Sequence, residues 1–338
     1  MIAGMEHIRV KTGKHCIFAT MQEALCYSGS NLTEAALFFL CGGMNIPYLG
    51  DPRTFWFKRM DQLTEPLVQS QSQFSLRNTP QAEKVNFRKD CMDSLSQGYP
   101  VLLLVHSQCL SYHRAYTENK TRGHVVMLYG LDWDRDEAHI ADAYLLDNSG
   151  RIHTYQGPVP LQELEAGCFS VTSYRPRSEH RQTSEAVLLG AYANHIDQFL
   201  EPDRTPSEGG LNANRQVISD LEDWAGMSGK ELRQSCQEVY YGLRVGGILH
   251  HIDYIQMFAD DAGLSLRAGY REAMLLLETV YREWKMYLLL LYKTGVQGRA
   301  ARMKELSASG LRLLELYEEA LRAYSRWLRA EGIGESLN

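Results

Sequence analysis

The sequence predicts an α+β domain followed by an all-helical domain. Helical periodicity comes first along the chain, short strand-like runs separated by turn residues follow it, and nearly every segment beyond residue 176 returns to a helical period. At 338 residues the chain is long enough for two domains that each bury a core. We therefore expect a first domain over residues 1–176 and a second over residues 177–338.

The first domain is expected to open with helices. Apolar residues at helical spacing follow Cys16 as far as a stop at Gly29, so Cys16 begins a helix. Asn31 and Glu34 have the spacing of a capping box, which predicts a second helix that ends near Cys41. A polar loop over residues 69–80 and an amphipathic helix over residues 82–97 come next.

Short runs rich in β-branched or aromatic residues follow, and they predict a sheet built by successive hairpins. These runs cover residues 101–106, 124–131, 138–144, 151–155 and 168–174. In the second domain, residues 271–293 and 309–330 carry apolar side chains at the spacing of long helices.

Composition and charge exclude several classes of protein. Apolar residues make up 44% of the chain and charged residues 22%, which is ordinary for a folded protein. The net charge of −6 gives no global reason to bind nucleic acid or anionic lipid. The longest apolar run, residues 286–292, is too short to cross a bilayer, and the N-terminus has no secretory apolar segment. We expect a cytoplasmic protein with neither nucleic-acid nor membrane partners.

No metal site is expected. The seven cysteines are scattered and include no C-x-x-C pair, so most are predicted to be reduced and buried. Residues 132–137 resemble a calcium loop, but Glu137 stands where such a loop needs glycine, and a hairpin tip is the better interpretation.

Three residues carry a pattern typical of nucleophilic catalysis: Cys16, His124 and Asp142. The helix that Cys16 opens favours a thiolate through its N-terminal partial charge. His124 and Asp142 lie 18 residues apart, on two runs that can pair as a hairpin around residues 132–137. Paired in this way, the carboxylate can orient the imidazole while the imidazole takes the thiol proton.

Each of the three also has a plain structural interpretation. Free cysteine is among the most buried residue types, and an isolated histidine or strand aspartate is more often structural than catalytic. The order of the three types, on elements of the right kind, favours catalysis.

Several stretches resemble the butirosin-biosynthesis acyltransferase (BtrH-like) family. The resemblance rests on residues 15–20, 27–29, 32–34 and 42–48, and on Gly209-Gly210-Leu211 and Arg244-Val245-Gly246-Gly247 in the second domain. Residues 123–126 and 141–142 are similar to the His and Asp strands of the related C39-type cysteine peptidases. The resemblance implies a papain-like (C39-like) cysteine-protease fold with a helical companion domain.

The resemblance also implies a function. Members of that family move an acyl group from a carrier-protein thioester to an amine, in the founding case an amino sugar. A cysteine-dependent, amide-forming acyltransferase of antibiotic biosynthesis is therefore expected, with catalytic Cys16, His124 and Asp142. Its partners would be an acyl or peptidyl carrier protein and an amine-bearing small molecule. No cofactor is expected beyond the carrier's own phosphopantetheine.

Two positions depart from the peptidase pattern. Val10 replaces the glutamine that would donate to the oxyanion, so the backbone N–H of Cys16 is the first candidate, with Lys14 or His15 second. Ala143 follows the aspartate where those peptidases often have proline.

Two rival functions remain open at this point. A cysteine peptidase or thioester hydrolase would use the same three residues, and a catalytically inactive binding or scaffold protein could keep the fold. Glu34 is interpreted as a helix cap, and the alternative is that its side chain reaches the site. Arg299, Arg302 and Lys304 form a basic cluster, either a solvated helix face or a dock for an acidic carrier.

Overall fold

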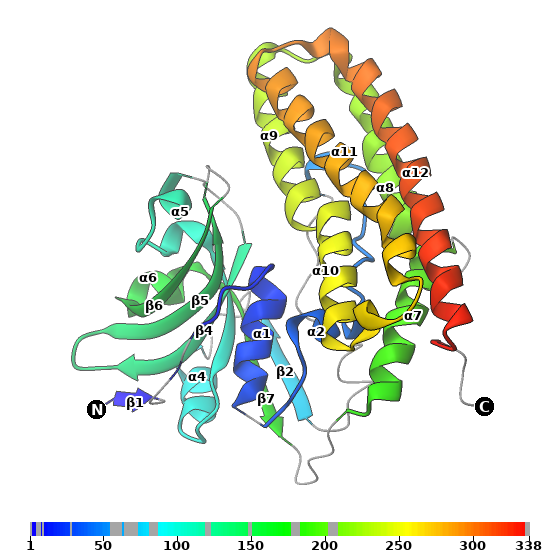
Figure 1. Cartoon of the computed structure of the whole chain (residues 1–338). Helices are drawn as coiled ribbons and strands as arrows, with labels where there is room; N and C mark the ends of the chain where they lie inside the picture. The colour runs from blue at the N-terminus through cyan, green and yellow to red at the C-terminus, as the bar shows by residue number, and fades with distance from the viewer. Residues whose placement is uncertain are drawn as a thin grey trace. The chain divides into compact units, whose positions relative to one another are not determined.

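A computed structural model describes residues 2–4, 8, 10–27, 29–54, 63, 74–80, 87–118, 123–147, 151–176, 183–201 and 209–334. The chain forms two compact units, one of mixed helix and sheet and one of helices (Figure 1). The first comprises residues 1–37 and 60–183, and the second residues 38–59 and 184–338. The predicted α+β class is confirmed.

The first unit is built on one antiparallel sheet. Among the described residues it has seven strands, in the order β2-β7-β3-β4-β5-β6, with β1 paired to β4. The strands are β1 (Ile2–Gly4), β2 (Phe74–Pro80), β3 (Val101–His106), β4 (Gly123–Asp132), β5 (Glu137–Leu146), β6 (Ile152–Pro160) and β7 (Cys168–Pro176). The hairpin expected around residues 132–137 joins β4 to β5.

All five runs predicted to be strands are strands, but the predicted loop over residues 69–80 is wrong in part. Residues 74–80 form β2, which pairs with β7 at the end of the strand order. An edge strand has only one neighbour and tolerates polar residues and a terminal proline, which is why composition alone concealed it.

Helices cover this sheet and complete its core. They are α1 (Cys16–Cys26), the start of α2 (Glu34–Leu40), α4 (Phe87–Leu95), α5 (Arg114–Glu118) and α6 (Leu161–Gly167). The helix α1 contacts β3, β4 and β5. Phe87 of α4 and Leu164 of α6 belong to the same buried cluster as Val126 and Ile140 of the central strands. Of the helix predicted over residues 82–97, residues 87–95 are helical and residues 82–86 lie outside the described residues.

The second unit is helical. Its helices are α7 (Glu185–Leu200), α8 (Gly210–Asp220), α9 (Gly229–Val245), α10 (Ile248–Asp261), α11 (Tyr270–Val296) and α12 (Met303–Ala330). Gly246 and Gly247 do not lie inside one helix: Gly246 ends α9 and Gly247 precedes α10. A Cβ at Gly247 would lie 2.4 Å from the Leu243 carbonyl oxygen, so this junction requires glycine.

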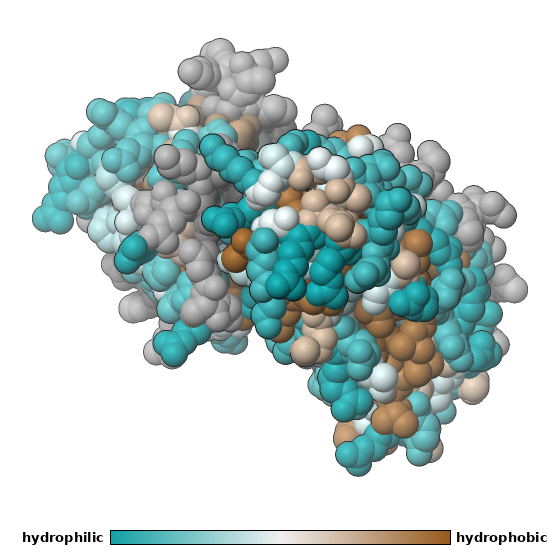
Figure 2. Space-filling model, turned by 90° about the horizontal axis from the view of Figure 1, so that it is seen from above, coloured by the Kyte–Doolittle hydropathy of each residue, from teal (hydrophilic) through white to brown (hydrophobic). Residues whose placement is uncertain are grey.

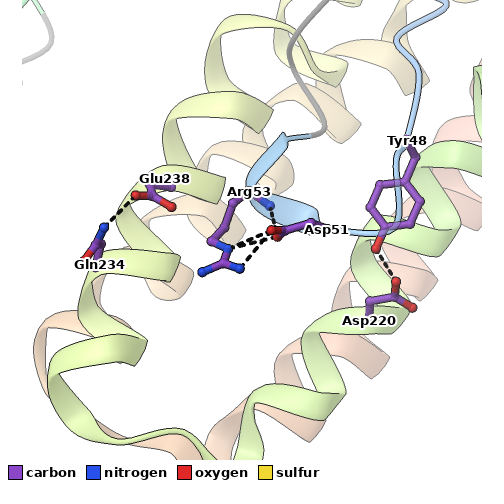
Figure 3. A network of polar contacts seen from close by, with 6 residues as sticks. All are labelled: Tyr48, Asp51, Arg53, Asp220, Gln234 and Glu238. Atoms are coloured by element: carbon purple, nitrogen blue, oxygen red, sulfur yellow. Dashed lines mark hydrogen bonds and ion pairs between the residues drawn. The ribbon is translucent and has the colours of Figure 1, made fainter. Parts of the chain in front are cut away.

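Residues 38–59, which the sequence assigned to the first domain, group with these helices. The ring of Phe38 stacks on Tyr254 with centroids 4.1 Å apart, and the Met44 amide donates to Nε2 of His195 at 3.0 Å. Figure 3 shows that Tyr48 reaches Asp220 of α8, and that Arg53, in the short helix Pro52–Thr54, is paired with Asp51. These contacts explain why residues 38–59 belong to the second unit, which the order of elements along the sequence does not reveal.

One helix of this unit exposes apolar side chains. On α11, Leu275 is 61% and Met286 65% exposed, and Leu289 and Leu290 are exposed as well. The space-filling view likewise shows hydrophobic atoms at the surface among hydrophilic ones (Figure 2). Within the described residues, every helix is too short or too polar to span a lipid bilayer.

The buried side chain of His251 makes the second unit sensitive to acid. Burial, reinforced by His195 and His250, lowers the pKa of His251 to about 3. In an unfolded chain a histidine has a pKa of about 6.5. Between these values the unfolded chain binds a proton that the folded chain does not. The free energy of unfolding therefore falls as the pH decreases through this window, by up to about 1.4 kcal/mol per pH unit.

We expect His251→Leu to flatten this dependence, because the variant has no ring to protonate. The measurement is denaturant unfolding between pH 7.5 and 4, comparing the slope of the unfolding free energy with that of the parent protein. His153→Gln serves as the control, because the His153 side chain lies in the first unit and is 37% exposed. Equal slopes in His251→Leu and the parent protein would contradict the prediction.

Candidate active site

Cys16 is the first residue of α1 and is partly exposed. The preceding residue, His15, is extended and accepts a hydrogen bond from the Ile17 amide on its Nδ1 at 3.1 Å, which caps the helix. Buried Phe18 and Met21 hold α1 in the first unit. The sulfur thus lies at the positive end of a helix anchored by its apolar face.

His124 and Asp142 come from the paired strands β4 and β5. The register pairs Met127 with Ala141, so Asp142 is a diagonal neighbour of His124 on one face of the sheet. Nε2 of His124 lies 3.0 Å from Oδ1 of Asp142. The carboxylate is fully buried, and only 7% of His124 is exposed.

Cys16 completes the constellation, because its side chain is hydrogen-bonded to that of His124. Burial by itself would lower the pKa of His124, but the negative charges of Asp142 and Cys16 outweigh it and raise this pKa to about 10. Burial would likewise raise the pKa of Asp142, yet His124 and neighbouring hydroxyls hold it below its usual value. The structure therefore brings the three sequence-predicted residues together, with the imidazole between sulfur and carboxylate.

Two tyrosines that sequence reasoning missed also contact Asp142. Tyr112 and Tyr116 both donate to its Oδ2, at 2.7 and 2.5 Å, and the Tyr144 amide donates to Oδ1 at 3.0 Å. The spacing of four residues between Tyr112 and Tyr116, just before the strand that carries His124, is the signal that could have identified them.

Glu34 is not the capping-box partner that the sequence predicted. Thr33 caps α2 by accepting from the Ala36 amide at 3.2 Å. The Glu34 carboxylate instead accepts from the amides of Lys14, at 2.9 and 3.2 Å, and His15, at 3.0 Å. Glu34 thus fixes the backbone immediately before the cysteine.

This contact also limits the possible oxyanion donors. The amides of Lys14 and His15, the second candidates from the sequence, donate to Glu34. The amide of Cys16 is not used by any residue that the structure describes. It remains the first candidate for the donor.

We expect Glu34→Ala to destabilise the protein by about 3 kcal/mol, since it leaves two amides beside a buried site without their charged acceptor. Reaction of Cys16 with iodoacetamide should also slow by about tenfold, because the backbone that positions the sulfur loosens. Denaturant unfolding measures the loss of stability, and the alkylation rate of Cys16 with iodoacetamide measures the loss of positioning.

Thr33→Ala is the matched control. It removes the cap of α2 and should cost about 1 kcal/mol without changing the alkylation rate. If Glu34→Ala left that rate unchanged, Glu34 would have no positioning role.

Two other sequence features have structural outcomes. Asp132 accepts from the amides of Asp134 and Arg135 at the tip of the β4–β5 hairpin, as the turn interpretation predicted. In the basic cluster, Arg302 lies 3.4 Å from Glu305, and Lys304 lies 3.8 Å from Glu222.

The fold and the site together define an α+β unit that aligns a cysteine, a histidine and an aspartate. Residues 15–143, the stretch that contains all three, match the family model described as butirosin biosynthesis protein H, N-terminal. The resemblance to the BtrH-like family is thereby confirmed over these residues. No curated protein matches the chain.

Proposed function

We propose that this protein is a papain-like, cysteine-dependent acyltransferase that forms amide bonds in antibiotic biosynthesis. The acyl donor would be a thioester on a carrier protein, and the acceptor an amine such as an amino sugar. The observation that carries the proposal is the position of His124, which is hydrogen-bonded both to the Cys16 side chain and to Asp142.

In the first half-reaction His124 takes the proton of the Cys16 thiol, and the sulfur attacks the thioester carbonyl. The carbon–sulfur bond to the carrier then breaks. The carrier's thiol leaves with the proton from His124, and the acyl group remains on Cys16. Because Nε2 of His124 is committed to Asp142, Nδ1 is the nitrogen that exchanges this proton.

In the second half-reaction an amine attacks the acyl-enzyme and passes a proton to His124, which returns it to the departing Cys16 sulfur. One thioester is consumed and one amide is formed, so the cycle needs neither ATP nor a redox cofactor. The Cys16 amide at the start of α1 is suited to stabilise the oxyanion in both halves.

The match to the butirosin biosynthesis protein H family supports this choice over a hydrolase, since that family is described by a biosynthetic protein. It also supports an antibiotic pathway as the setting. A carrier protein and an amino acceptor are the partners that such a cycle requires.

The test is to incubate the protein with an acyl-carrier thioester, with and without a panel of amino sugars, and to weigh the products. Amide that forms only with amine present supports the proposal. Free acid at the same rate with or without amine would replace it with thioester hydrolysis. No turnover, together with an unreactive Cys16, would indicate a binding protein.

A further inference from the structure

The Asp142 carboxylate, which is hydrogen-bonded to His124, has more donors around it than are needed to orient the imidazole. Oδ1 of Asp142 faces His124 and the Tyr144 amide, both at 3.0 Å, and Oδ2 accepts from the hydroxyls of Tyr112 and Tyr116. Asp142 is fully buried, so these four donors take the place of water around the charge.

Both phenols are suited to remain donors. Burial and the charge of Asp142 raise the pKa of Tyr112 and of Tyr116 well above the ordinary value, so both stay protonated at any working pH. Their rings are held in place: Tyr112 stacks on Tyr155 of β6 with centroids 3.9 Å apart and meets Tyr116 edge-on at 5.6 Å. The two hydroxyl groups are therefore fixed on Oδ2 by packing.

The two tyrosines differ in one contact. The hydroxyl of Tyr116 also lies 2.7 Å from Nε2 of His124, and the two rings are 4.9 Å apart. Because this hydroxyl donates its own proton to Asp142, its oxygen is the acceptor toward the imidazole. The Nε2 proton is therefore shared between Oδ1 of Asp142 and the oxygen of Tyr116.

We propose that Tyr116 is a positioning residue of this site: it holds the proton on Nε2 of His124 and thereby leaves Nδ1 for the sulfur. Together with Tyr112 it also keeps Asp142 ionised. Tyr112 shares only the second role, because its hydroxyl contacts the carboxylate and is not bonded to His124 among the described contacts. This inference rests on the proposed function, in which Cys16 and His124 are the reacting pair.

The two roles affect different parts of the pH profile of Cys16 reactivity, that is, of the rate at which iodoacetamide alkylates Cys16. Loss of either hydroxyl removes a donor from Asp142 and raises the pKa of that carboxyl. Protonation of Asp142 then switches the site off at a higher pH, which moves the acid limb of the profile upward. Loss of the contact with Nε2 weakens the ring's alignment at every pH, which lowers the plateau. The other titrating groups that face this cluster are Cys16, through His124, and Tyr155, through Tyr112.

The test measures the rate of alkylation of Cys16 by iodoacetamide from pH 4 to 10 in the full chain and in Tyr112→Phe and Tyr116→Phe. We expect both variants to move the acid limb upward. Tyr116→Phe alone should lower the plateau, by about tenfold, while Tyr112→Phe stays within about twofold of the parent protein. A purely structural role would lower the melting temperature without changing either feature.

A second measurement in the unsubstituted protein covers the case in which Tyr116→Phe does not fold. Nitrogen-15 NMR of His124 should show a proton bonded to Nε2, with a nuclear Overhauser effect to the hydroxyl proton of Tyr116. A proton carried only on Nδ1 would overturn the inference. A reactive Cys16 whose profile is identical in Tyr116→Phe would overturn the inference and leave the function standing, whereas a Cys16 that is unreactive in the parent protein would overturn both.

Discussion

Replacement of Cys16 by alanine is expected to lower kcat of acyl transfer by on the order of 10^4- to 10^6-fold, as loss of a nucleophile from a cooperating triad does. Cys16 is the cysteine at the start of α1 and is hydrogen-bonded to His124, so alanine leaves the described site without its sulfur. A steady-state assay with acyl-carrier and amine gives the ratio of kcat between the parent protein and Cys16→Ala. Binding of the acyl-carrier should be nearly unchanged, because alanine removes only the sulfur.

Cys26→Ser is the matched control, since Cys26 is an exposed cysteine at the opposite end of the same helix. Although the residue is exposed, partial desolvation of its thiol and the charge of Glu23 raise the pKa of Cys26, so less of it is thiolate at neutral pH. We expect this variant to keep the parent rate. Full activity in Cys16→Ala, or loss of activity in Cys26→Ser, would contradict the proposed nucleophile.

The second large effect is expected for Asp142→Asn, which should reduce kcat by about 10^4-fold while the fold is retained. The carboxylate is one of the two negative charges that raise the pKa of His124 to about 10. Without it the desolvation of the buried ring is less opposed, so the pKa of His124 should fall and the ring should be neutral at a lower pH. Titration of His124 by NMR in the parent protein and the variant measures this shift directly.

The control for this variant is Asp147→Asn. Asp147 also pairs with a histidine, because its Oδ2 lies 2.8 Å from Nε2 of His153. Neither residue of this pair belongs to the proposed triad, so activity should remain within about twofold of the parent. A comparable loss in the two variants would show that Asp142 acts only through the stability of the fold.

Local pattern was sufficient to predict most of the elements. The strands from residue 101 onward were recognisable because β-branched and aromatic runs alternate with turn residues, and α1 because its apolar face has one clear period. The strand β2 was missed because polar residues such as Ser75 and Asn78 carry no strand signal; the pairing with β7 decides their conformation. Long-range pairing is not encoded in a local window.

The site shows the same division between local and long-range information. Cys16, His124 and Asp142 could be predicted from the sequence because nucleophilic catalysis, the proposed role, restricts residue type and order. Glu34 fits a local capping motif in the sequence. Only the folded chain shows that its carboxylate contacts the amides of His15 and Lys14, which lie 19 and 20 positions earlier. Tyr112 and Tyr116 gave only a spacing, which is common in helices, and their role depends on a strand that follows them in sequence.

The most direct test of the central claim is the intact mass of the protein after mixing with one equivalent of acyl-carrier in the absence of amine. The account predicts a gain equal to the acyl group, located on the peptide that contains Cys16, and its loss as an amide when amine is added. An unmodified Cys16 in a preparation that still converts acyl-carrier and amine to amide would contradict it.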